Sequence, residues 1–168
     1  MAAELKPDTI VVISPHAVMY ADYFHVSPGK EARGDFGRFM APQIGVEAGY
    51  DEAFVRELDR LCGDDDFPMG TEGEREKELD HGTLVPLYFI NQHYRDYKLV
   101  RIGGSGLSFA DHYRAGRYIA RAAENLGRSV FIVASGDLSH KLRGDGPYGY
   151  SVQGPEYDER IMDVMVGV

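Results

Sequence analysis

Residues 130–140 read VFIVASGDLSH, an apolar, β-branched run that passes directly into a polar turn ending at His140. Residues 9–16 show the same arrangement, TIVVISPH, so that His16 follows the apolar segment Thr9–Ser14. Short apolar runs bounded by turn residues are typical of buried strands in parallel sheets. In such sheets ligands bind beyond the carboxyl ends of the strands. The sequence therefore places two histidines where an α/β fold binds its ligands.

Segments with helical spacing alternate with these strands. Asp51 caps a predicted helix whose apolar face ends at Cys62, a core residue, and another helix runs from about Ser108 to a stop at Gly127. A third strand, KLVRI, is predicted at residues 98–102, and residues 81–94 and 155–166 are predicted to be helical. This alternation predicts an α/β fold with a mainly parallel central sheet flanked by helices.

Two stretches lack such periodicity. Residues 15–42 are rich in Gly, Pro and aromatic residues, and we expect a long irregular loop with His25 on its surface. Residues 64–80 are acidic and contain Gly, which favours a solvated loop. Because no convincing linker separates the segments, we expect residues 1–168 to form a single domain.

The chain of 168 residues carries 27 acidic and 18 basic side chains, which gives a formal net charge of −9. The excess comes from residues 1–80, which hold 18 acidic and 8 basic residues. This balance disfavours binding to nucleic acid, which requires a basic surface, and to anionic membranes. One cysteine excludes an internal disulfide, and no apolar run approaches the ~20 residues of a membrane span. We therefore expect a cytoplasmic protein.

Three histidines follow a strand or loop and are flanked by Pro, Gly or Ser: His16, His81 and His140. A neutral imidazole is the commonest metal ligand and also exchanges protons near neutral pH. Two imidazoles and a carboxylate on one face of a metal leave positions open for substrate and O2, as in non-haem Fe(II) oxygenases. The spacing alone leaves open whether the three histidines meet or have separate structural roles.

The three histidines lie in the motifs SPHAV, LDHGTLVPLYF and VASGDLSH. In this order, over residues 9–140, the motifs resemble those of the LigB-like catalytic subunits of class III extradiol ring-cleavage dioxygenases. The superfamily also contains Memo-like proteins. The resemblance implies that His16 and His81 bind Fe(II) at the carboxyl ends of the strands and that His140 is the catalytic acid–base. Asp137 could orient His140, with capping of a turn as the alternative role.

The resemblance further implies an aromatic diol substrate, O2 as co-substrate and ring opening next to the diol, and we expect a homo-oligomer. The family's third iron ligand is a Glu well beyond the SGDLSH-type motif. Here only Glu156 and Glu159 follow His140, and neither lies in the expected context. We therefore expect the catalytic domain to be truncated at its C-terminus. Two alternatives remain, a zinc-dependent hydrolase on the same residues and a Memo-like metal-binding module without ring cleavage.

Overall fold

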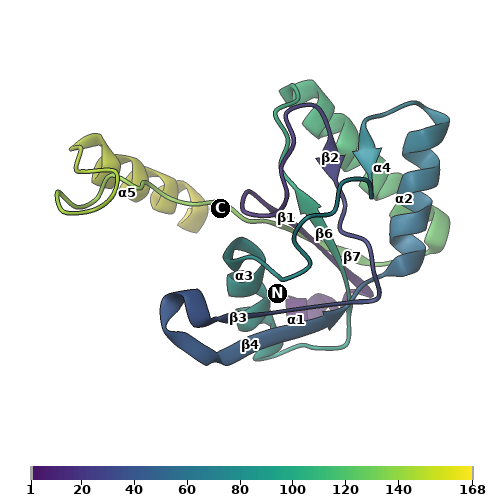
Figure 1. Ribbon diagram of the computed structural model, residues 1–168, viewed down its shortest axis with the longest axis horizontal. Helices are drawn as coiled ribbons and strands as arrows, with labels where there is room; N and C mark the ends of the chain where they lie inside the picture. The colour runs from purple at the N-terminus through teal and green to yellow at the C-terminus, as the bar shows by residue number, and fades with distance from the viewer. Residues whose placement is uncertain (1, 168) are drawn as a thin grey trace. The chain divides into compact units, whose positions relative to one another are not determined.

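The computed structural model describes residues 2–167, which divide into two compact units (Figure 1). The first unit extends through Ser135 and contains strands β1–β7 and helices α1–α4, beginning with the short helix α1 (Ala2–Leu5). The second unit starts at Gly136 and contains helix α5 (Gln153–Val166). The expectation of a single domain stays a prediction.

The first unit is built on a parallel sheet of three strands. β1 (Thr9–Ser14) lies in the centre, between β6 (Lys98–Gly103) and β7 (Val130–Ala134). Both neighbours run parallel to β1, and Val11 is in register with Val100 of β6. The predicted α/β fold with a parallel central sheet is therefore confirmed.

Two helices cover one face of this sheet. α2 (Glu52–Asp64) and α4 (Phe109–Leu126) begin where Asp51 and Ser108 accept hydrogen bonds from N–H groups of the first helical turn. A left-handed Gly127 ends α4, as the sequence predicts. The core on this face includes Val11, Phe54, Leu58, Leu61, Val100 and Ile119.

The opposite face is covered by one helix and a hairpin. Helix α3 (His81–Asn91) packs there together with the antiparallel strands β3 (Glu31–Phe36) and β4 (Ala41–Gly49). A short 3-10 turn, η1 (Gly37–Phe39), joins the two strands. Because successive side chains of a strand point to opposite faces, this core takes the alternate residues of β1 and β6. It includes Ile10, Val12, Leu84, Leu87 and Leu99.

The hairpin corrects the expectation that residues 15–42 form a long irregular loop. Within that range β2 (Phe24–His25) also pairs in parallel with β5 (Met69–Gly70). The hairpin strands are rich in Gly and charged residues, and Ala32 and Val46 are their buried residues, so their apolar alternation is weak. Packing on the loop before α3 orders them instead, since Leu79 donates its N–H to the carbonyl of Arg33.

The second unit consists of the polar segment that follows β7 and helix α5. An isolated bridge pairs Leu142 with Tyr150, and the Asp158 carboxylate accepts the N–H of Ser139 at 2.6 Å. Gly154 allows α5 to approach this segment, because a Cβ there would lie 2.6 Å from the carbonyl oxygen of Lys141. These contacts hold the segment that contains His140 against its own helix.

No helix among residues 2–167 is both long enough and apolar enough to cross a membrane.

Cys62 is fully buried on α2, and burial raises the pKa of its thiol to about 12. The thiol is therefore protonated and unreactive at neutral pH, which confirms the prediction that Cys62 is a core residue.

Candidate metal centre

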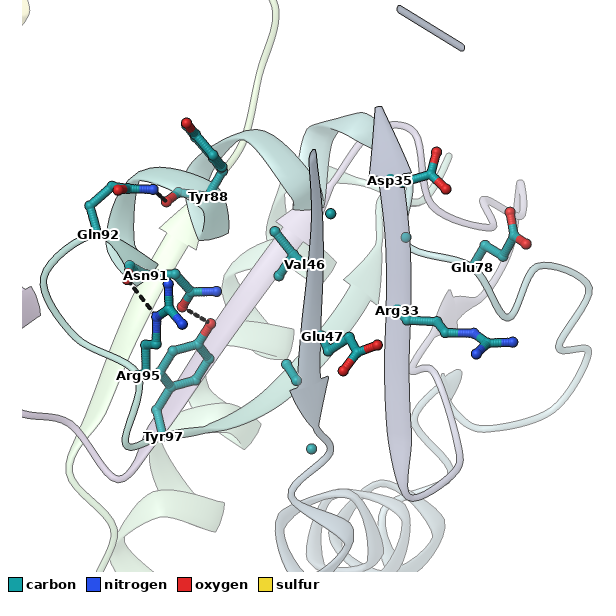
Figure 2. Close-up of a pocket in the computed structure, with 14 residues that line it drawn as sticks. Arg33, Asp35, Val46, Glu47, Glu78, Tyr88, Asn91, Gln92, Arg95 and Tyr97 are labelled. Atoms are coloured by element: carbon teal, nitrogen blue, oxygen red, sulfur yellow. Dashed lines mark hydrogen bonds between the residues drawn. The ribbon is translucent and has the colours of Figure 1, made fainter. Parts of the chain in front are cut away.

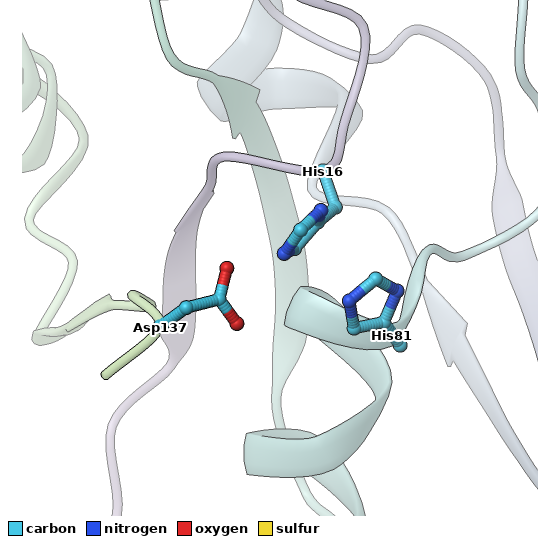
Figure 3. A group of neighbouring side chains, drawn as sticks. All are labelled: His16, His81 and Asp137. Carbon is cyan, nitrogen blue, oxygen red and sulfur yellow. The ribbon is translucent and has the colours of Figure 1, made fainter. Parts of the chain in front are cut away.

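Two histidines from distant parts of the first unit lie side by side. His16 lies in the turn after β1, and His81 is the first residue of α3 (Figure 3). Their ring centroids are 3.9 Å apart, and the ring planes are inclined by 36°. Both residues are partly buried. The structure thus brings together the two residues to which the motifs assign metal binding.

Asp80 connects the backbones that carry these rings. Its Oδ1 accepts hydrogen bonds from the Thr83 N–H at 3.0 Å and from the Ser14 hydroxyl at 2.5 Å, while its Oδ2 accepts the Thr83 hydroxyl at 2.9 Å. The bonds to Thr83 make Asp80 the N-cap of α3, so that the helix begins at His81. The Ser14 hydroxyl oxygen in turn accepts the N–H of His16 at 3.2 Å. One carboxylate therefore holds both candidate ligands.

The first turn of α3 lies directly against the turn that carries His16. A Cβ at Gly82 would collide with the Ser14 hydroxyl oxygen and would lie 3.2 Å from Cδ2 of His16. A Cβ at Gly103, the last residue of β6, would collide with the carbonyl oxygen of Val18 in the same connection. These two close approaches require glycine, because any side chain would separate the elements.

The paired rings suit a divalent transition metal. Imidazole nitrogen binds iron, zinc, copper and nickel, and two such donors from one region match the two-histidine part of a non-haem iron or zinc site. The Phe39 ring meets the His81 ring edge to face, with 5.5 Å between centroids. Both oxygens of Asp80 already accept hydrogen bonds, so Asp80 holds the two histidines in place and is not itself a candidate ligand.

A cavity of about 320 Å³ opens beside His81. The 3-10 turn η1, the loop before α3 and α3 itself form its walls, which combine the apolar Phe39 and Leu84 with charged side chains. The charged residues are Asp35, Arg38, Arg75, Glu76, Lys77 and Glu78. A larger cavity of about 700 Å³ lies between the hairpin and the C-terminal end of α3 (Figure 2). The larger cavity is lined by neither histidine, so the smaller one is the candidate substrate space.

Two polar side chains in this region are buried, although the sequence analysis did not predict their burial. His25 was expected at a loop surface, and this is wrong, because it is fully buried. Its Nδ1 lies 2.9 Å from the carbonyl oxygen of Glu72, and its Nε2 lies 3.4 Å from the Glu74 carboxylate. Arg101 is only 1% exposed. The burial of Arg101 could have been recognised from the sequence, because a charged residue inside the apolar strand KLVRI requires buried hydrogen-bond partners.

The other predicted site residues belong to the second unit. Asp137 Oδ2 lies 3.8 Å from Nε2 of His140, and the His140 ring stacks on Tyr148 with 5.0 Å between centroids. The separation exceeds hydrogen-bond length, so the contact becomes an ion pair only when the imidazole is protonated. Glu156 and Glu159 lie on α5. The catalytic roles of His140 and Asp137 stay predictions that rest on the VASGDLSH motif.

Comparisons with known proteins extend over nearly the whole chain. The family model for the catalytic LigB subunit of aromatic ring-opening dioxygenases matches residues 1–166. A protein of Clostridium acetobutylicum is 37% identical over 164 residues, which cover 94% of this chain and 35% of that protein. The 3,4-dihydroxyphenylacetate 2,3-dioxygenase of Escherichia coli is 27% identical over 148 residues, or 84% of this chain and 53% of that enzyme. The chain thus spans about a third and about half of the lengths of these two relatives.

Proposed function

Because this chain belongs to the LigB family of catalytic subunits of aromatic ring-opening dioxygenases, we propose that it supplies two ligands of a non-haem Fe(II) centre that opens a catecholic ring with O2. The convergence of His16 and His81, with 3.9 Å between ring centroids, carries the proposal. We assign only these two ligands to this chain, which spans about a third and about half of the lengths of its two relatives.

In this proposal the two histidines and Asp80 have defined roles. His16 and His81 each give one ring nitrogen to the iron, and Asp80 holds the backbones of both through Ser14 and Thr83. When bound, the iron supplies a positive charge that lowers the pKa of the diol and brings substrate and O2 together. The cavity beside His81, at about 320 Å³, lies at the lower end of the range for ligand pockets and suits a single aromatic ring.

For proton transfer we assign His140, on the basis of its motif. An imidazole takes up a proton near neutral pH, so it can accept one from a substrate hydroxyl and return it when the ring opens. Asp137 lies 3.8 Å from Nε2 of His140 in the same unit, and we propose that it orients this imidazole.

Replacing His140 by alanine is expected to leave the iron content unchanged and to lower the rate of ring opening about 10²–10⁴-fold, the usual contribution of a general acid–base. Metal analysis and O2 consumption, measured on the same sample, give the two readouts. Asp137→Asn serves as the matched variant and is expected to lose less activity. Loss of iron together with activity would place His140 among the ligands, and unchanged activity would remove it from the mechanism.

Metal analysis after anaerobic purification, followed by O2 uptake with a panel of catechols, tests the function itself. We expect about one Fe(II) per chain, O2 consumption with at least one catechol, and a yellow ring-fission product. Zinc in place of iron, with hydrolysis that needs no O2, would support a hydrolase. No uptake with any catechol by the iron-loaded product of the complete reading frame would overturn the dioxygenase and support a Memo-like module.

The cytoplasmic location and the homo-oligomer also stay proposals. A single, buried cysteine is consistent with a reducing compartment. The family match supports a small aromatic diol and O2 as partners. The net charge of −9 disfavours nucleic acid and anionic membranes.

A further inference from the structure

Arg101 is a buried cation in the middle of β6, with a side chain only 1% exposed. Its guanidinium donates three hydrogen bonds, to the Ser27 hydroxyl oxygen at 2.7 Å and to the carbonyl oxygens of Glu78 at 2.6 Å and Glu76 at 2.5 Å. Its nitrogens also lie 3.8 Å from Oδ2 of Asp80 and 3.9 Å from a carboxylate oxygen of Glu74. Each guanidinium nitrogen therefore has a partner.

Most of these partners belong to the segment that leads into α3. Residues 71–80 contain no helix or strand in the described structure, so no ladder of backbone hydrogen bonds fixes their path. Arg101 replaces such a ladder by binding the carbonyls of Glu76 and Glu78. The segment ends at Asp80, which caps α3 and lies within ion-pair distance of the same guanidinium.

A continuous chain of contacts runs from this guanidinium to the candidate metal ligands. Arg101 faces Asp80, Asp80 accepts the Ser14 hydroxyl, and the Ser14 oxygen accepts the N–H of His16. On its other side Asp80 binds Thr83 and so fixes the start of α3 at His81. Through these contacts, the positions of both imidazoles depend on one buried side chain of the sheet.

We propose that Arg101 is a positioning residue that fixes the separation of His16 and His81, an inference that rests on the proposed metal site. The planar guanidinium can bind several acceptors in one fixed arrangement, which an ammonium group cannot do. Groups that hold metal ligands in place typically change metal affinity about 10–100-fold when they are removed. The alternative is that Arg101 only stabilises the fold, and the two roles predict different effects on metal affinity.

Zn²⁺ affinity of the 168-residue chain, measured by competition with a chromophoric chelator, separates the two roles. Arg101→Met is expected to weaken Zn²⁺ binding at least about tenfold. Arg101→Lys keeps the positive charge but lacks the planar guanidinium that binds several acceptors. We therefore expect its Zn²⁺ affinity to be closer to that of Arg101→Met than to that of the wild type. The control is Leu61→Ala, which opens the core on the opposite face of the sheet and is expected to change affinity less than about twofold at comparable loss of stability in urea.

Ser14→Ala tests the same chain of contacts without disturbing a buried charge, in case Arg101→Met does not fold. It removes the link between Asp80 and His16, and we expect a loss of Zn²⁺ affinity of about tenfold. Wild-type affinity in folded Arg101→Lys and Ser14→Ala would overturn the positioning role while leaving the metal site intact. Failure of the wild type itself to bind Zn²⁺ or Fe(II) would overturn the assignment of His16 and His81 as ligands, and the positioning role with it.

Discussion

Substitution of His81 by alanine is expected to lower metal affinity more than about 100-fold, beyond what loss of a supporting group costs, so that the purified chain retains almost no iron. The same result is expected for His16→Ala, because each variant leaves a single imidazole where two converge. One imidazole cannot hold a divalent ion against water and buffer at micromolar protein concentration. Iron and zinc content per chain, measured after anaerobic reconstitution and desalting, gives the readout.

The matched control for both variants is His93→Ala. His93 is exposed beyond the C-terminal end of α3, in the same unit but away from the paired rings. Its removal is expected to leave the metal content unchanged and the free energy of unfolding within about 0.5 kcal/mol of the wild type. If either His16→Ala or His81→Ala retains one metal per chain while remaining folded, the ligand assignment is wrong.

The parts of the fold that were predicted correctly are those in which one local signal decides the structure. The apolar runs of β1, β6 and β7 each form a strand, and β1 and β6 are buried on both faces, as is typical of a parallel sheet. The burial predicted for residues 130–134 is wrong, because β7 has no buried residue and Ile132 is 50% exposed. Asp51, Ser108 and Gly127 act at helix ends through contacts within a few residues, so they can be recognised without knowledge of the tertiary structure.

The hairpin and the buried polar residues were missed because their order depends on residues distant in sequence. β3 and β4 are held by contacts with Leu79 and α3, and their Gly-rich strands carry little alternation of their own. His25 is buried by residues of the loop before α3, which neither its own neighbours nor its spacing indicate. Arg101 was visible as a charge in an apolar strand, but its partners could be found only in three dimensions.

The candidate site shows the same division. Motif resemblance selected His16 and His81, and the structure places their rings together. The spacing of the two residues could not have shown this, because their approach depends on Asp80, Ser14 and the absence of a side chain at Gly82.

Gly82→Ala is expected to weaken metal binding about 10–100-fold, although alanine is the better helix former by about 1 kcal/mol. The new Cβ would collide with the Ser14 hydroxyl oxygen, which accepts the N–H of His16 and donates to Asp80. Relief of the collision must move α3 or the turn after β1, and each of them carries one of the paired histidines. The strain is expected to cost about 1–3 kcal/mol, more than the gain in helix propensity.

Gly116→Ala provides the control, because Gly116 also lies inside a helix, α4, where an added Cβ would meet no atom within 4 Å. There the same substitution is expected to stabilise the chain by about 0.5–1 kcal/mol and to leave metal affinity unchanged. Zn²⁺ titration and urea unfolding on both variants separate helix propensity from the close approach. Unchanged affinity in folded Gly82→Ala would mean that the contact between α3 and the turn after β1 does not set the spacing of the two imidazoles. A selective loss in Gly82→Ala would show that the metal centre depends on a position without a side chain as well as on the two rings.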